Sequence, residues 1–231
     1  MQKIVRVLNL GRLEYNKSLK LQQTLVRQKL NGEKKDYLIL VEHDPVYTIG
    51  LRKQNYPDEY LENLKNSGAQ VVKTDRGGLI TFHGPGQLVA YPILDLKNYQ
   101  PSLKWYVSRL EETVIDLCRV NFDLKAYRMC QTGYTGVWCQ DAKIAAIGIY
   151  AKKYVTYHGI SINCNVDLKW FDQIVPCGIT DKTVSTLSKL KNEVNLGPKE
   201  IQPMYLDSFK RVFNCDLEIV NEEEVNNLIK L

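Results

Sequence analysis

Twelve residues in the first half of the chain, Arg76 to Gln87, constrain what this sequence can build. Five of the twelve are Gly or Pro, whereas an ordinary turn needs one or two. Two Gly-rich turns therefore bracket a short strand, residues 79 to 83, and glycine lets backbone approach other groups closely. Arg76 adds a forked cation, and His83 a ring that can titrate near neutral pH. We expect these turns to line a pocket for an acyl or anionic group; a hairpin that merely connects strands fits the spacing equally well.

The composition is that of a globular chain with a sizeable core. Of the 231 residues, 44% are apolar and 25% are charged, so we expect a single domain spanning residues 1–231. No apolar run approaches the ~18 residues of a membrane helix, and no secretory signal peptide is visible. These features predict an intracellular protein with no membrane partner.

Six cysteines are present, and none forms a CxxC motif or pairs with a histidine at zinc spacing. A chain of this length with a real core does not need disulfides. We therefore expect reduced thiols, most of them small buried hydrophobes, and no metal site.

The order of patterned segments predicts a mixed sheet flanked by helices, an α/β (α+β) fold. The prediction has three main parts. The first is a helix at Tyr15–Leu30. The second is a helix capped by Ser102 that runs to about Val120 with Leu103 facing inward. The third is a hairpin of Lys143–Ala151 with Val155–Cys164.

Cys177 is the candidate nucleophile, because Pro176 precedes it and Gly178 follows it. Such flanks favour a loop, where a thiol can be exposed and held in one orientation. A structural cysteine in a turn explains the same residues equally well.

A nucleophilic thiol needs a group that favours its thiolate, since a free thiol titrates near ~8.5. Lys143 begins an apolar run, and if it points inward its ammonium would stabilise a thiolate. His158, which Gly159 follows, is a second candidate for the group that favours the thiolate. An exposed lysine at the start of a strand is the commoner arrangement.

Four motifs together resemble the lipoyl(octanoyl) transferase family over about residues 11–215. They are Arg76-Gly-Gly with Thr81-Phe-His-Gly-Pro-Gly-Gln87, Lys143-Ile-Ala-Ala-Ile-Gly148, His158-Gly159 with Asn163, and Asp167-Leu-Lys-Trp-Phe171 with Pro176-Cys177-Gly178. The segment 170–177 resembles most the mitochondrial members of animals. Leu79 departs from many bacterial members, which carry a polar residue there.

The resemblance implies a fold like the biotin/lipoate protein ligase catalytic domain and transfer of an octanoyl group from acyl carrier protein to a lysine of a lipoyl domain. It implies that Cys177 forms the acyl thioester and that Lys143 lowers its pKa. The residues that the resemblance places at the acyl substrate are Arg76, Gly77, Gly78, Leu79, Ile80, Thr81, Phe82, His83, Ala146, Ile147, Gly148, Gly159, Ile160 and Ser161.

The same resemblance implies that no cofactor is needed, neither ATP nor a metal, since the octanoyl donor arrives on the phosphopantetheine of acyl carrier protein. The acceptors it implies are lipoyl domains of 2-oxoacid dehydrogenase E2 subunits and the glycine cleavage H protein. We expect a monomer in the mitochondrion, or in the cytoplasm if the source is bacterial.

Rival functions remain open at the level of sequence. An ATP-dependent lipoate or biotin protein ligase would use an acyl-adenylate and no cysteine nucleophile. A non-catalytic binding module would not need Cys177, Lys143 and His83 together. Nucleic-acid binding rests on charge alone, and no basic stripe interleaved with aromatic residues supports it.

Charge is unevenly distributed along the chain, although the net charge is only +5. Residues 1–35 hold nine Lys or Arg against two Glu. We expect Lys17, Lys20 and Lys29 to contribute to a docking face for acidic partner proteins; a solvated helix face is the simpler interpretation.

Overall fold

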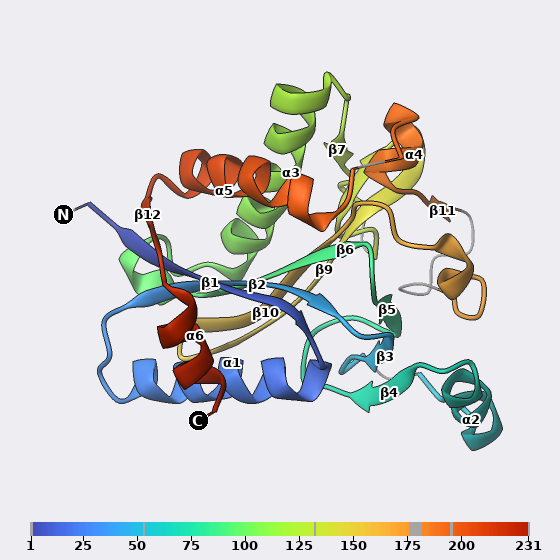
Figure 1. The fold of residues 1–231 in the computed structure, drawn as a ribbon, viewed down its shortest axis with the longest axis horizontal. Coiled ribbons are helices and arrows are strands. Elements are labelled where there is room, and N and C mark those ends of the chain that lie inside the picture. Colours follow the sequence, from blue (N-terminus) through green and yellow to red (C-terminus); the bar gives the residue numbers. More distant parts are fainter. Residues whose placement is uncertain (1, 53, 132, 176–181, 195, 231) are drawn as a thin grey trace.

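The computed structural model describes residues 2–52, 54–131, 133–175, 182–194 and 196–230 (Figure 1). Among these residues, nine strands form one mixed sheet, in which β11 is a branch that pairs with β9. The order of the other eight strands is β12-β1-β2-β6-β10-β9-β8-β7. The strands are β1 (Ile4–Leu13), β2 (Asp36–His43), β6 (Gln87–Ile93), β7 (Tyr127–Arg128), β8 (Val137–Cys139), β9 (Ala142–Lys152), β10 (Val155–Asn163), β11 (Thr183–Val184) and β12 (Asp216–Ile219). The predicted mixed sheet is therefore confirmed.

A second, smaller sheet lies beside the first and carries the Gly-rich stretch. Its strand order is β4-β3-β5, from β3 (Val46–Ile49), β4 (Gln70–Lys73) and β5 (Thr81–His83). Helix α2 (Asp58–Asn66) connects β3 to β4 at the edge of the molecule (Figure 1). Chain reversal at residues 84–86 takes β5 of the small sheet directly into β6 of the large one, so the two sheets meet there.

Helices cover both faces of the main sheet. Helices α3 (Leu103–Phe122) and α5 (Pro198–Phe213) pack on one face, and α1 (Tyr15–Leu30) with α6 (Glu222–Ile229) on the other (Figure 1). A short helix, α4 (Leu187–Lys191), follows β11. No described helix is long and apolar enough to cross a membrane.

The side chains along the central strands point alternately to the two faces of the main sheet, which explains why helices cover both faces. On β2, Leu38 and Leu40 pack toward α3 and α5, while Tyr37 and Ile39 pack toward α1. Side chains of successive strand residues point to opposite faces, so a strand that is apolar throughout must be buried on both.

Two sequence predictions about helices need correction. Helix α1 has the predicted bounds and α3 has the predicted Ser102 cap, whose hydroxyl accepts from Trp105 N. Leu103, however, is 45% exposed, because Trp105 and Tyr106 take the inward positions at this end of α3. Lys29 is buried and paired with Asp36, with 2.7 Å between Nζ and Oδ1, so it is not part of an exposed docking face.

Candidate active site

A cavity lies where the two sheets meet, between β5, β6, β9, β10 and the first residue of α1. It is a narrow cavity of about 30 Å³ that is partly open to solvent. Its lining combines glycine backbone with a few polar side chains: Tyr15, Arg76, Gly78, Thr81, His83, Val89, Tyr91, Ala146, Ile147, Gly148, His158, Gly159, Ile160 and Ser161.

Arg76 holds the Gly-rich turn in shape from inside. Its guanidinium donates to the carbonyl oxygens of Gly77, Leu79 and Thr48 at 2.9, 2.8 and 2.6 Å, and to the Thr48 hydroxyl. Only 6% of Arg76 is exposed. These bonds tie the turn before β5 to β3, so this side chain fixes one wall of the cavity.

Gly148 shows why backbone alone forms part of that wall. A Cβ atom at this position would lie 2.9 Å from both Arg76 Cδ and Gly77 O. Real Cβ contacts are not this close, so any side chain at Gly148 would displace the turn. Glycine here lets β9 pack directly on the Gly-rich stretch.

Lys143 lines a smaller cavity that adjoins the first one. Thr81, Ala146 and Ser161 line both cavities. On β8 and β9, Val137 pairs with Ala145 but Trp138 pairs with Lys143, so Ile144 is an extra residue. This β-bulge shifts the alternation and places Lys143 on the cavity side together with Ala146. The expectation that Lys143 points inward is confirmed.

The Lys143 ammonium is held by its surroundings. Lys143 is 5% exposed, its Nζ donates to Thr135 O at 3.0 Å, and it lies 4.8 Å from the centroid of the Trp138 ring. Glu111, buried on α3, lies close enough for the lysine charge to act on its carboxyl. Burial raises the pKa of Glu111 despite that neighbour.

His83 begins a chain of buried hydrogen bonds that has one consistent direction. Asn163 Nδ2 donates to Ser185 O, so Asn163 Oδ1 accepts from Gln87 Nε2 at 2.9 Å. Gln87 Oε1 must then accept from His83 Nδ1, at 3.1 Å. His83 is thereby held in the tautomer whose Nε2 is an acceptor. Burial lowers the pKa of His83 to about 3, and the charge of Arg76 acts in the same direction, so the ring is neutral.

Aromatic rings and a second buried histidine form another wall. His43 Nδ1 lies 2.8 Å from Leu13 O and therefore donates, so its Nε2 accepts from Tyr91 OH at 2.9 Å. Burial lowers the pKa of His43 to about 4. Tyr15 stacks on His83 with ring centroids 6.3 Å apart. This wall is hydrogen-bonded and uncharged.

His158 lies at the other end of the cavity from Lys143. It pairs with Ile149, six residues along β9 from Lys143, which is on the order of 15–20 Å of strand. Its Nε2 lies 2.8 Å from Asp75 Oδ1. Lys143 and His158 are therefore not equivalent neighbours of one thiol, as the sequence suggested they could be.

Ten of the fourteen residues predicted at the acyl substrate line the cavity. The other four are Gly77, Leu79, Ile80 and Phe82. The side chains of Ile80 and Phe82 point instead into the core of the small sheet, and Phe82 stacks on Trp170. Gly77 N donates to Ile149 O at 2.9 Å, which joins the two sheets. The predicted contact of all fourteen residues with substrate stays a prediction, and Cys177 lies outside the described residues.

Several site residues were not found from the sequence. Gly136 packs against Lys143, because a Cβ there would lie 3.4 Å from Lys143 Cε and 2.5 Å from Ala145 O. The glycines at 133 and 136 were the signal for this tight turn. Tyr15 and Tyr91 had no motif of their own; only the phase of their helix and strand points them at the cavity.

The arrangement suits the binding of a narrow chain-like group. Buried Lys143 lies at one end of the two adjoining cavities, and the pair of His158 and Asp75 lies at the other end. Neutral His83 lies between them, on a wall that is partly glycine backbone. Among the described residues, no cluster of three or more His, Cys, Asp or Glu is placed to hold a metal ion.

Comparison with known proteins identifies the class. Residues 14–213 match the family model of the lipoyl protein ligase A/B catalytic domain. A crystal structure of lipoate-protein ligase A bound with ATP superposes with a TM-score of 0.78 over 100% of this chain and 93% of that one, at 16% identity, and so shares the fold. The biotin protein ligase of Aquifex aeolicus gives 0.50 over 93% and 70% of the two chains, at 14% identity.

Relatives with assigned names indicate which members of this family the chain is similar to. The mitochondrial octanoyl-acyl-carrier-protein:protein N-octanoyltransferase of Danio rerio is 48% identical over 92% of this chain and 94% of its own. The human protein of that name is 40% identical, over 97% and 99%. An octanoyltransferase of Desulforamulus reducens is 37% identical, over 96% and 97%. The chain therefore belongs to the lipoyl protein ligase A/B catalytic-domain family, among its octanoyltransferases, and is an acyltransferase.

Proposed function

We propose that this enzyme transfers an octanoyl group from octanoyl-acyl carrier protein, through a thioester on Cys177, to a lysine of an acceptor protein. The observation that carries the proposal is the cavity: a glycine-walled slot with buried Lys143 at one end, in a chain similar to octanoyltransferases over nearly its whole length. Residues 176–181 follow a described segment whose Phe171 lines the Lys143 cavity.

The first half-reaction exchanges one thioester for another. The Cys177 thiolate, paired with the Lys143 ammonium, attacks the octanoyl carbonyl, and a new carbon–sulfur bond forms. The bond to the phosphopantetheine sulfur breaks, and that sulfur leaves with the proton of Lys143. The step is nearly isoenergetic, and it leaves octanoyl-Cys177 beside a neutral lysine.

The second half-reaction makes an amide. The neutral amine of the acceptor lysine attacks the Cys177 thioester, a carbon–nitrogen bond forms, and the amine gives up its proton to Lys143. Cys177 departs as a thiolate, which restores the starting ion pair. Because the amide is more stable than the thioester, the sequence is drawn forward with no ATP, and neither a metal nor another cofactor takes part.

Lys143 has a dual role in this scheme. Its ammonium favours the thiolate electrostatically, and its neutral form accepts the proton of the incoming amine. Its bond to Thr135 O and the glycine contact at Gly136 hold it in place for both steps. The two groups titrate as a coupled pair, so neither has a pKa of its own.

The docking partners are acidic carrier proteins. Lys17 and Lys20 are exposed on α1, within two turns of Tyr15, which lines the cavity. This places positive charge close to the site where an acyl carrier protein must deliver its arm. We assign the acceptor role to lipoyl domains of 2-oxoacid dehydrogenase E2 subunits and to the glycine cleavage H protein.

The names of the animal relatives support a location for this enzyme. The animal proteins similar to this chain are named mitochondrial. We propose a mitochondrial enzyme, or a cytoplasmic one if the source is bacterial, that acts as a monomer.

An acylation assay tests the proposal. Purified enzyme is mixed with a lipoyl domain and either octanoyl-acyl carrier protein without ATP, or free octanoate with ATP and Mg²⁺. We expect octanoyl-lysine only in the first mixture, and none with the Cys177→Ala variant. Acylation that requires ATP and free octanoate would overturn the proposal in favour of an acyl-adenylate ligase.

A further inference from the structure

A buried carboxyl on α3 lies close to Lys143, and the reaction scheme gives it no part. Glu111 is 6% exposed, and its Oε1 accepts a hydrogen bond from Gly136 N at 3.1 Å. Lys143 Nζ donates to Thr135 O at 3.0 Å. Thr135 O and Gly136 N belong to one peptide group, so the carboxyl and the ammonium bond to opposite sides of the same rigid plane. Glu111 and Lys143 are therefore linked through one peptide and two hydrogen bonds.

Gly136 packs this peptide tightly against β9. Its φ is +130°, a conformation that L side chains rarely adopt, and a Cβ there would lie 2.5 Å from Ala145 O. Across the peptide and its two hydrogen bonds, Glu111 Oε1 and Lys143 Nζ are at most roughly 9 Å apart. In a buried site, one charge acts appreciably on another over this distance.

Two cations among the described residues act on the Glu111 carboxyl. They are Lys143 on β9 and Arg128 on β7, and Arg128 is also paired with Glu112, the next residue of α3. Burial raises the pKa of Glu111. The hydrogen bond from Gly136 and the charges of the two cations oppose that rise, so they favour the ionised carboxylate.

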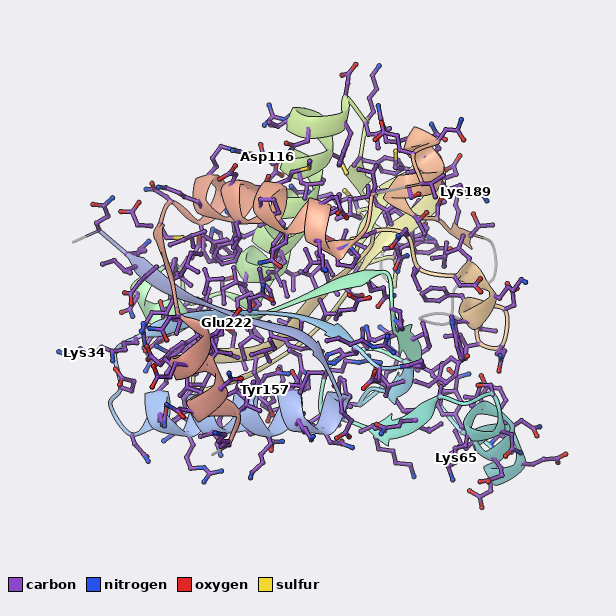
Figure 2. All side chains as sticks on the ribbon, in the orientation of Figure 1. Lys34, Lys65, Asp116, Tyr157, Lys189 and Glu222 are labelled. Atoms are coloured by element: carbon purple, nitrogen blue, oxygen red, sulfur yellow. The ribbon has the colours of Figure 1, made fainter. Side chains whose placement is uncertain are left out.

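Other charges near this pair are either matched or absent from the described residues. On α5, which packs against α3, Arg211 pairs with Asp116 where the two helices meet (Figure 2). The other described side chains that line the Lys143 cavity are uncharged. His83, in the adjoining cavity, is neutral. Glu111 is therefore well placed to act on Lys143 by its charge.

We propose that Glu111 is a positioning residue that stabilises the ammonium form of Lys143, an inference that rests on the proposed octanoyl transfer. In the first half-reaction, an N–H bond of Lys143 breaks as the departing phosphopantetheine sulfur takes the proton. In the second, neutral Lys143 takes a proton from the acceptor amine. Because the Glu111 carboxylate favours the ammonium in both, Lys143 keeps its proton to a higher pH.

Removing the charge of Glu111 with little change of shape tests this role. Glu111→Gln keeps an oxygen that can accept from Gly136 but carries no charge. We expect the alkaline limb of enzyme acylation to move to lower pH by about one unit, since Lys143 loses its proton earlier. Single-turnover acylation by octanoyl-acyl carrier protein, followed across pH by intact-protein mass spectrometry, measures this limb. An unmoved limb would overturn the inference.

The second half-reaction should respond in the opposite sense. In octanoyl-Cys177 the thiol is esterified, so Lys143 titrates without its coupled partner. Isolated octanoyl-enzyme of Glu111→Gln should acylate a lipoyl domain several-fold faster below the pKa of Lys143, because more of the lysine is neutral. Comparison with the unaltered enzyme at each pH cancels the titration of the acceptor amine. A variant that slows both half-reactions at every pH would show a merely structural role and contradict the inference.

Two further variants serve as controls. Glu112→Gln removes the same charge one residue along α3, at the partly exposed partner of Arg128, and should shift neither profile. Glu111→Asp keeps the charge on a shorter side chain, so it should move the alkaline limb less than Glu111→Gln does. If the bond to Gly136 alone mattered, Glu111→Asp would be the more disturbed of the two, and the inference would fail.

The same assay separates the two levels of the argument. Absence of an octanoyl adduct on the unaltered enzyme would remove the proposed function. An adduct that forms normally, with a pH profile that Glu111→Gln does not shift, would remove only the role of Glu111.

Discussion

At the scale of single residues, the site depends on where one lysine and three histidines point. The run that begins at Lys143 could be recognised in the sequence, but the direction of Lys143 depends on the bulge at Ile144, which only the partner strand reveals. The His83 motif predicted a titratable group, yet the structure holds this ring neutral, because it is buried beside Arg76 and His43. Local sequence named these residues, and tertiary contacts decided their chemistry.

Replacing Lys143 tests its role directly. We expect Lys143→Ala to raise the pKa of the Cys177 thiol and to lower octanoyl transfer by about 10²–10⁴-fold, because both the favourable charge and the proton acceptor are lost. The rate of iodoacetamide labelling of Cys177 across pH reports the thiol pKa. Lys169→Ala, at an exposed lysine, serves as the control. An unchanged labelling profile in Lys143→Ala would contradict the assignment.

At the scale of elements, the buried pair of Lys29 and Asp36 fastens the end of α1 to the start of β2. The side chains are 2% and 7% exposed, and the Lys29 ammonium also donates to Lys35 O at 2.8 Å. From the distribution of charge along the sequence, we predicted that Lys29 is exposed. Its phase on the helix, together with the acid at the start of the next strand, was the signal that it is buried.

Breaking this pair should loosen the helix without touching the site. We expect Lys29→Met to lower the free energy of unfolding by about 3–5 kcal/mol, since it leaves the Asp36 carboxylate buried without its cation. Urea denaturation measures the change. Lys20→Met, on the exposed face of the same helix, should stay within ~0.5 kcal/mol. Equal effects of the two substitutions would refute the structural role of Lys29.

The exposed face of α1 has a separate role in this account. We expect charge reversal at Lys17 and Lys20 to raise KM for octanoyl-acyl carrier protein several-fold. The difference in KM between this variant and the unaltered enzyme should decrease as salt is added. Lys199→Glu reverses one charge on α5, across the main sheet, and should leave KM unaltered, whereas reversal of Lys17 alone should already raise it (Figure 1). An unchanged KM in the α1 variant would remove the docking proposal.

At the scale of the whole molecule, the order of strands and helices could be predicted from periodicity and turn residues, and so could the mixed sheet. The meeting of two sheets around the cavity could not, because it depends on pairs far apart in sequence, such as Gly77 with Ile149 and β6 with β10. The resemblance of four motifs to a known family supplied what periodicity alone did not.

Buried neutral histidines make global stability depend on pH. In the fold the pKa values of His43 and His83 are lowered to about 4 and about 3, from ~6.5 in an unfolded chain. Below pH 6.5 the unfolded state therefore binds more protons than the folded state does. The free energy of unfolding decreases as the pH is lowered. The expected loss is about 2 kcal/mol per pH unit between pH 6 and 5. Denaturation curves across this range measure it, and a flat profile would contradict the neutral, buried state of these rings.

The central claim is that the acyl group passes through Cys177, and intact-protein mass spectrometry tests it most directly. The enzyme is mixed with octanoyl-acyl carrier protein, without ATP and without acceptor. The account predicts a mass gain of one octanoyl group that hydroxylamine removes and that Cys177→Ala lacks. An enzyme that acylates lipoyl domains from the carrier protein yet never shows this adduct, or shows it equally in Cys177→Ala, would contradict the account.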